Sequence, residues 1–546
     1  MKKSNPTERQ NKITMKKHFY LIAALGLGIV SCTDSDLKND GSQDNITSGQ
    51  ESDIAKLTTI KLNSSNSSQD RINVYPSTRD ENSEKPLELI AEIKNISEDE
   101  NFDGFTKEDR LLSATCVYYD KETQTYYATY HMQGNNYYTD QEIETSGYIE
   151  SFQIEGNTPK LEKIYWAADA SGKTYDFNHL YFDDLNKIEY VGEYTGDKSE
   201  GTRIIVAGHS SEPVKTGTGF NTKAIIGKID FEQESLTVAD VMTGDKIYDE
   251  NITNKDGSLA SLGDEDAADV NCVVRKYNHY YLTTRKGVAV LKAGKENLFQ
   301  PETDVNDKIY FLKTPGSAKF ISQPTFTSGV DILYLTQYNP EELTKDTSSP
   351  ANVIQFALDT TDGKDLPIHM NDVDNFSWSN LISPNQLLLG NIESISPVDG
   401  KNVLVASSNN TGAIYTCLGR NGLYVFNPTY DYKQDEIIKF TDAKEGNTSR
   451  PVNGIYVEDW DDYNGHHYTD GFIYVANGAC LTILDAKTLE KVAEYSAFDG
   501  TNAISANYVH VVKSNTYTNE HVPDRIITVA YGQAGVKVFR FVPPTK

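Results

Sequence analysis

Histidines and acidic residues are the first side chains to consider, because they could bind a metal ion or transfer protons. Their densest group is the segment DWDDYNGHHYTDG, residues 459–471, where His466 and His467 stand among aspartates. Imidazole and carboxylate groups are ordinary metal ligands in proteins. Gly465 and the polar residues around it, however, indicate a loop between two strands, and adjacent side chains on a loop seldom converge on one ion. We therefore predict no metal site here.

Catalytic motifs are also missing from the chain. It contains no GxSxG nucleophile elbow, no HExxH and no phosphate-binding loop. No pair of carboxylates is placed well enough to predict a glycosidase acid and base. His179 in YDFNHLYF and His510 in NYVHVV lie in strand-like apolar runs, where a histidine is ordinarily a hydrogen-bonded structural residue. The sequence predicts no catalytic residue and no cofactor.

The elements that must position these residues are strands. The last stretch, residues 525–542, reads RIITVAYGQAGVKVFRFV: apolar alternation, a glycine turn, and alternation again. This pattern predicts a β-hairpin. The same unit recurs at residues 471–488 and 280–294, and a shorter version lies at residues 420–429. One hairpin repeated along hundreds of residues indicates an all-β repeat fold, and we predict a β-propeller.

The repeats divide the body, residues 85–546, into seven units, each expected to form a four-stranded blade. Their spacing is roughly 65 residues, longer than the repeats of common propellers, and six or eight blades are also compatible with it. The seventh unit ends after three strands, and we expect Leu87 to Lys94 to supply its fourth. The predicted units are Leu111–Ala167, Asp176–Thr243, Ala267–Pro315, Lys319–Asp374, Leu387–Asp442, Val452–Asp499 and Ala503–Val542.

Composition excludes one class of partner. The formal net charge of the 546-residue chain is −28, whereas nucleic-acid binding needs clustered Lys and Arg. We predict no nucleic-acid ligand and a monomer. The cysteines of the body lie in apolar runs with no CxxC motif, so we expect buried thiols rather than disulfides or a zinc site. They are Cys116, Cys272, Cys417 and Cys480.

The first 31 residues read as a targeting segment. Lys16 and Lys17 precede a short apolar run, Phe19 to Val30, which is too short to span a membrane as a helix. It ends in Ile29-Val30-Ser31-Cys32, which resembles the lipobox of bacterial lipoproteins. That resemblance implies that Cys32 is lipidated and attaches the protein to a membrane. The following residues, 32–84, are rich in Ser, Asn, Asp and Gln, and we predict a flexible tether with at most a stray strand at Lys56 to Leu62.

Several hairpins carry a second resemblance. Residues 287–291, 422–426, 481–485 and 535–539 each contain the apolar strand that follows a glycine turn or a short turn. These positions resemble the LVIVD and YncE-like propeller repeats. Together with the leader, the chain resembles propeller lipoproteins of Bacteroidota. The resemblance implies an outer membrane lipoprotein, on the periplasmic side or at the cell surface, and implies no catalytic residue.

The function predicted from these features is binding. We expect a lipid-anchored binding or scaffold protein that presents one face to a glycan, a peptide or a partner protein. The alternative is an exported hydrolase or polysaccharide lyase with its site at the propeller channel, using His179 and His510. Long loops between the second and third strands favour one face for the ligand. The aromatic residues that they offer are Tyr137, Tyr138, Phe220 and Tyr338, and the opposite face offers Trp460, His466 and His467.

Overall fold

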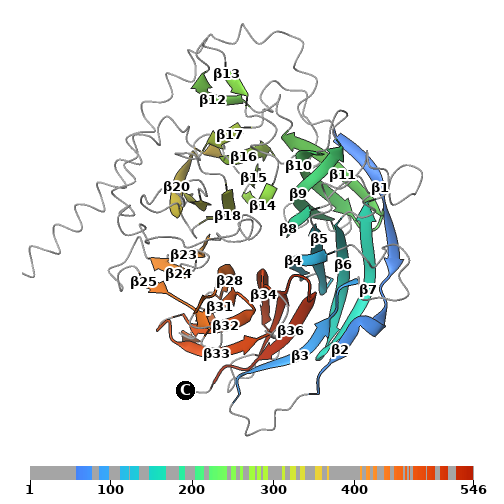
Figure 1. Cartoon of the computed structure of the whole chain (residues 1–546), viewed down its shortest axis with the longest axis vertical. Helices are drawn as coiled ribbons and strands as arrows, with labels where there is room; N and C mark the ends of the chain where they lie inside the picture. Colours follow the sequence, from blue (N-terminus) through green and yellow to red (C-terminus); the bar gives the residue numbers. More distant parts are fainter. Residues whose placement is uncertain are drawn as a thin grey trace, which may run out of the picture. The chain divides into compact units, whose positions relative to one another are not determined.

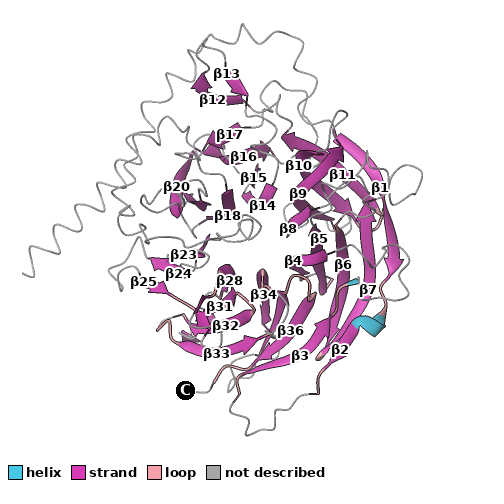
Figure 2. Cartoon of the chain, in the orientation of Figure 1, coloured by secondary structure: helices cyan, strands magenta, loops and turns pink. Residues whose placement is uncertain are grey.

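The computed structural model consists almost entirely of strands in the part of the chain that it describes (Figure 2). The described residues are 57–76, 85–96, 111–121, 123–133, 147–167, 184–190, 203–213, 220–242, 248–253, 259–261, 270–276, 279–284, 287–292, 310–313, 320–326, 332–338, 351–359, 366–367, 406–408, 414–417, 422–426, 436–442, 448–458, 462–463, 466–467, 471–486, 488–497, 504–513 and 524–544. Among them the single helical element is the 3-10 turn η2 (Gln69–Arg71). The predicted leader and Cys32 lie outside the described residues. Within those residues, no helix is long and apolar enough to cross a membrane.

Within these residues the strands form seven antiparallel sets of four, which we number blade 1 to blade 7. Blades 1 to 4 are β4 (Leu111–Asp120), β5 (Thr125–Gln133), β6 (Tyr148–Glu155) and β7 (Thr158–Ala167); β8 (Asp184–Tyr190), β9 (Arg203–Pro213), β10 (Phe220–Asp230) and β11 (Ser235–Met242); β14 (Val270–Lys276), β15 (His279–Thr284), β16 (Gly287–Lys292) and β17 (Tyr310–Lys313); β18 (Phe320–Phe326), β19 (Ile332–Tyr338), β20 (Ala351–Asp359) and β21 (Leu366–Pro367). Blades 5 to 7 are β22 (Ala406–Ser408), β23 (Ile414–Cys417), β24 (Leu423–Phe426) and β25 (Glu436–Ile438); β28 (Val452–Val457), β31 (Phe472–Asn477), β32 (Cys480–Asp485) and β33 (Lys491–Ser496); β34 (Tyr508–Lys513), β35 (Arg525–Ala530), β36 (Val536–Phe541) and β3 (Leu87–Ile93). Short hairpins pair β12 (Tyr248–Thr253) with β13 (Leu259–Ser261), β26 (Thr441–Asp442) with β27 (Thr448–Ser449), and β29 (Asp462–Tyr463) with β30 (His466–His467).

The blades are arranged as a β-propeller. The first strand of each blade contacts the first strand of the next, in the order β4, β8, β14, β18, β22, β28, β34, and β34 in turn contacts β4. Three of these strands, β28, β34 and β4, can be followed in Figure 1. The first strands are therefore the innermost ones, and the fourth strands lie at the outer edge. The all-β propeller expected from the repeated hairpins is confirmed. The strands of blades 1 to 6, and β34 to β36 of blade 7, fall inside the seven predicted units.

The chain ends meet in blade 7, as predicted. β3 pairs antiparallel with β36, from Leu87 opposite Phe541 to Ile93 opposite Val536. The register shifts at a bulge between Leu89 and Ala91, and the neighbouring residues Ile90 and Ala91 are both fully buried. Gly535, in the turn before β36, has a φ of +78°, and a Cβ there would lie 2.1 Å from the carbonyl oxygen of Ile93. A glycine turn therefore makes room for the closing strand.

Part of the predicted tether, the segment directly before β3, is built into the propeller. Residues 57–76, which we call the belt, contain β1 (Leu57–Asn66), η2 and β2 (Ile72–Val74). β1 pairs with β11 through its first half and with β7 through its second half, and β2 pairs with β3. Figure 1 shows β1 alongside β11 and β7. The polar composition of this stretch predicted a tether, but a strand at a sheet edge is held mainly by backbone hydrogen bonds, which any side chain permits.

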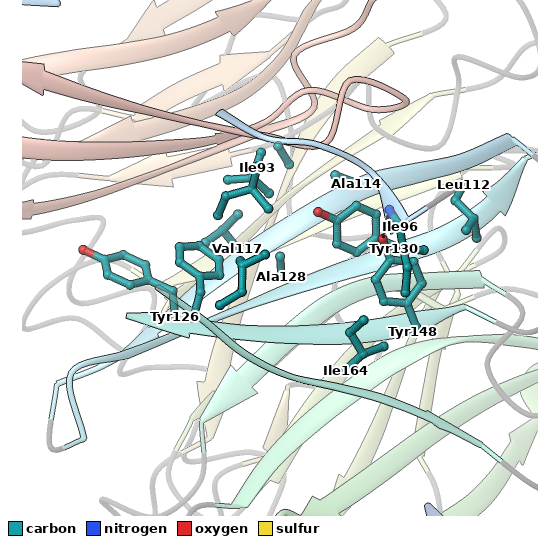
Figure 3. Packing of buried hydrophobic residues seen from close by; sticks show 14 residues of the cluster. Ile93, Ile96, Leu112, Ala114, Val117, Tyr126, Ala128, Tyr130, Tyr148 and Ile164 are labelled. Carbon is teal, nitrogen blue, oxygen red and sulfur yellow. Dashed lines mark hydrogen bonds between the residues drawn. The ribbon is translucent and has the colours of Figure 1, made fainter. Parts of the chain in front are cut away.

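Blades 7 and 1 share a continuous apolar core (Figure 3). It joins Ile93 of the closing strand to Val117, Ala128 and other buried residues of blade 1. The rings of Tyr130 and Tyr148 stack in it, with centroids 4.2 Å apart and planes within 7°. Offset stacking of buried rings adds to the stabilisation that burial provides. This core fixes blade 1 against the place where the two ends of the chain meet.

Asparagines connect neighbouring blades near the start of the innermost strands. The registers of β8, β14 and β28 each contain a bulge whose extra residue is Asn186, Asn271 or Asn453. The amide nitrogen of Asn453 donates to the carbonyl oxygen of Ala506 in blade 7 at 2.9 Å. Asn507, directly before β34, donates in the same way to Ala114 of blade 1 at 2.9 Å. A bulge re-aims a side chain, and the re-aimed amide of Asn453 satisfies a carbonyl group of the next blade.

Candidate functional site

The loop residues predicted to bind a ligand are only partly within the described chain. Tyr137 and Tyr138 lie outside it. Phe220 begins β10 opposite Pro213, and Tyr338 ends β19 opposite Ala351. Both therefore lie where the second and third strands of a blade meet, on the side that the sequence favoured. The blade 2 loop was overestimated, because β9 and β10 extend through residues 203–213 and 220–230, which leaves residues 214–219 as the connection.

The opposite face carries the other predicted residues. Trp460 and His179 lie outside the described residues. His466 and His467 form β30, in register with Tyr463 and Asp462 of β29. Across the described residues, no group of three His, Cys, Asp or Glu side chains gathers as a metal site would require.

The structure brings three rings together on the innermost strands of blades 6, 7 and 1. Tyr456 of β28, His510 of β34 and Tyr119 of β4 are all half-buried. The His510 ring centroid lies 5.5 Å from that of Tyr456, edge to face at 73°, and 6.3 Å from that of Tyr119, tilted at 43°. We call these three side chains the inner row. All three side chains are partly exposed, and Tyr119 and Tyr456 also pack against the buried cores between blades.

Buried rings support both ends of the inner row. Tyr119 packs on Tyr126 at 4.5 Å, and Tyr126 stacks on Phe152 at 5.2 Å. At the other end, the rings of Tyr456 and the buried Tyr474 pack edge to face, with centroids 6.2 Å apart. Partial burial, with the nearby charge of Asp120, raises the pKa of Tyr119, so its phenol keeps its proton at neutral pH. The inner row therefore consists of rings held in place, with polar groups at their edges.

An ion cluster lies next to the inner row, at the ends of β28 and β34. The carboxylate of Glu458 accepts a hydrogen bond from Tyr474 Oη at 2.8 Å and from Arg525 Nε at 3.2 Å. Lys513 Nζ lies 3.2 Å from it. Burial lowers the pKa of Arg525, but the hydrogen bonds and charge of Glu458 outweigh burial and hold that pKa above its usual value. Burial also raises the pKa of Tyr474 well above its usual range.

This arrangement is better suited to binding than to acid–base catalysis. The two charged groups that a catalytic histidine would need beside it, an acid and an arginine, are paired with each other. The side chains of Glu458 and Arg525 are only 4% and 3% exposed, so neither reaches a ligand directly. Rings with polar edges can instead stack on the apolar face of a sugar or on an aromatic side chain. The inner row is therefore the candidate site of the described chain.

Sequence reasoning found one of the three rings. It placed His510 in an inner strand, and this is confirmed. Tyr119 and Tyr456 were missed, although both lie within the last three residues of the first strand of a unit, the position from which an inner strand can present a side chain near the axis. The predicted buried thiols are found at Cys116, Cys417 and Cys480. Burial raises the pKa of the Cys480 thiol.

The similarities of this chain to known proteins are weak. No family model matches the chain, and no curated protein matches it. Among solved structures, it is similar to the β-propeller domain of Cps50 (Swd1) from Myceliophteria thermophila, with 7% identity, 79% of this chain and 96% of that chain covered, and a TM-score of 0.38. It is also similar to the extracellular domain of a putative hybrid two component system from B. thetaiotaomicron, with 10% identity, 79% and 41% covered, and a TM-score of 0.37. The WD40 domain of Toxoplasma gondii coronin is similar at 11% identity, 80% and 86% covered, and a TM-score of 0.35.

Proposed function

We propose that this protein is an exported, lipid-anchored binding protein whose ligand presents a ring to the inner row. The observation that carries the proposal is the set of half-buried rings of Tyr456, His510 and Tyr119 on three consecutive innermost strands. A glycan, or an aromatic side chain of a peptide or partner protein, has the matching surface. The chain's net charge of −28 disfavours polyanionic ligands. We also propose that its hairpins are repeats of the LVIVD or YncE-like type, which they resemble.

Ligand binding should depend on the inner row. We expect His510→Ala to weaken binding of a glycan or peptide identified on an array by about tenfold, because a ring at the centre of a contact contributes about 1–2 kcal/mol. Tyr456→Phe should keep most of the affinity, since it keeps the ring. Isothermal titration calorimetry of residues 57–546, the body together with the belt, measures both. Tyr75→Ala is the matched control, because Tyr75 is exposed on the belt.

The loop aromatics provide the rival location. If Tyr137→Ala with Tyr138→Ala abolishes binding while His510→Ala does not, the ligand occupies the face of the long loops and the inner row is structural. Turnover of a glycan by the purified body, lost in His510→Ala, would instead support the alternative of a hydrolase or polysaccharide lyase. The array should therefore be read for product formation as well as for binding.

The anchor can be tested separately. Lipidation of Cys32 is proposed from Ile29-Val30-Ser31-Cys32 at the end of an apolar leader. Cys32→Ser should move the protein from the detergent phase to the aqueous phase in a partition assay, because the lipid chains would be absent. A variant that stays in the detergent phase contradicts the anchor. Protease treatment of intact cells then distinguishes the cell surface from the periplasmic side of the outer membrane.

A further inference from the structure

The belt crosses the outer edges of three blades in succession. Leu57 to Lys61 pair with β11 of blade 2, and Leu62 to Asn66 pair with β7 of blade 1. After η2, the strand β2 pairs with β3 in blade 7. Because the belt precedes β3 in the chain, any pull on the residues before Leu57 reaches the belt before it reaches the strand that closes the propeller.

A buried ion pair holds the C-terminal part of the belt against blade 1. The side chains of Arg71, at the end of η2, and Glu150, in β6 of blade 1, form a salt bridge and are 2% and 1% exposed. Arg71 also donates to the carbonyl oxygen of Lys94 at 2.6 Å. Burial lowers the pKa of Arg71, but the charge of Glu150 and the hydrogen bonds to it raise that pKa above its usual value. If the guanidinium of Arg71 left this position, the buried carboxylate of Glu150 would lose its cationic partner.

Polar side chains also hold the part of the belt that precedes Arg71. The amide of Gln69 donates to the carbonyl oxygen of Leu161 at 2.7 Å and accepts from its backbone N–H at 3.1 Å. It thereby extends the pairing of β7 beyond the end of β1. Ser64 donates to Glu234 of blade 2 at 2.6 Å. Of the belt side chains from Lys61 onward, Leu62 is the one buried apolar residue, and the half-buried Ile72 packs against the core of blades 7 and 1.

We propose that the belt is a mechanical clasp. It takes up tension applied to the N-terminal end of the chain through the β1 pairings and the Arg71–Glu150 ion pair, and it keeps that tension away from the β3–β36 pairing. The inference is independent of the ligand, and it holds for any attachment upstream of Leu57. It assigns a role to a segment whose composition resembles a linker but whose pairing belongs to the propeller.

Single-molecule pulling between the two termini of the full chain tests the clasp. We expect a first step that releases residues 57–84, a contour of roughly 90–100 Å at about 3.3–3.6 Å per residue, followed by opening of blade 7. Arg71→Met should make this first step about a hundredfold faster at zero force, because it leaves Glu150 buried without its cation. Lys160→Met is the matched control, since its ion pair with Glu155 is exposed, with side chains 62% and 67% accessible.

Two outcomes would overturn the proposal. One is a single opening event in the unaltered protein, with no earlier step of belt length. The other is a first step whose rate is the same in Arg71→Met as in Lys160→Met. If Arg71→Met fails to fold, Gln69→Ala replaces it, because it removes the two hydrogen bonds to Leu161 without leaving a buried charge; an unchanged first step in that variant also rejects the clasp.

Discussion

Removal of residues 1–95 is expected to unfold the protein, whereas removal of residues 1–84 should leave it folded. The difference is the closing strand β3, whose Ile90, Ala91 and Ile93 side chains are 0% exposed. Burying one isoleucine side chain stabilises a protein by about 1.5–3 kcal/mol, and the loss of β3 also leaves the backbone groups of β36 unpaired. The sum is a large fraction of the 5–15 kcal/mol that holds an ordinary domain together.

Thermal unfolding followed by circular dichroism, with size-exclusion chromatography, measures this effect. Removal of residues 1–56 serves as the control and should leave the unfolding temperature nearly unchanged, because the first described pairing begins at Leu57. The variant that lacks residues 1–84 should fall between the other two, since it loses the belt and keeps β3. Equal unfolding temperatures with and without residues 85–95 would contradict closure of the propeller by β3.

The second large effect is expected at the ion pair between Glu458 and Arg525. Glu458→Leu should lower the free energy of unfolding by about 3–5 kcal/mol, because it leaves the guanidinium of Arg525 buried without its carboxylate. The double variant Glu458→Leu with Arg525→Leu should lose less than the sum of the two single variants, since apolar replacement of both partners leaves no stranded charge. Urea unfolding of the three variants gives the coupling energy directly.

A half-exposed ion pair within blade 7 provides the control. Arg540 and Asp524 also form a salt bridge, but their side chains are 34% and 26% exposed. Asp524→Ala is therefore expected to change the free energy of unfolding by about 1 kcal/mol or less. If Glu458→Leu costs no more than Asp524→Ala, the ion cluster beside the inner row is not the stabilising feature that its burial indicates.

Local pattern was enough to predict the strands of this protein. Alternation of apolar residues about glycine turns, as in residues 525–542, depends only on neighbours in the chain, because the side-chain period of a strand is two. The repeat of that pattern predicted the blades, and the missing fourth strand of the last unit predicted that Leu87 to Lys94 closes the propeller. Each of these conclusions follows from the need to bury one face and to leave no open sheet edge.

Contacts between distant residues were decided by the tertiary structure alone. A stray strand was predicted at Lys56 to Leu62, but nothing local indicated that it pairs with blades 1 and 2. The ion pair of the belt joins Arg71 to Glu150, 79 residues away. The inner row collects Tyr119, Tyr456 and His510 from three blades, and no local spacing links them. Sequence determines which segments become strands; only the packing of blade against blade determines which rings meet and which charges are buried together.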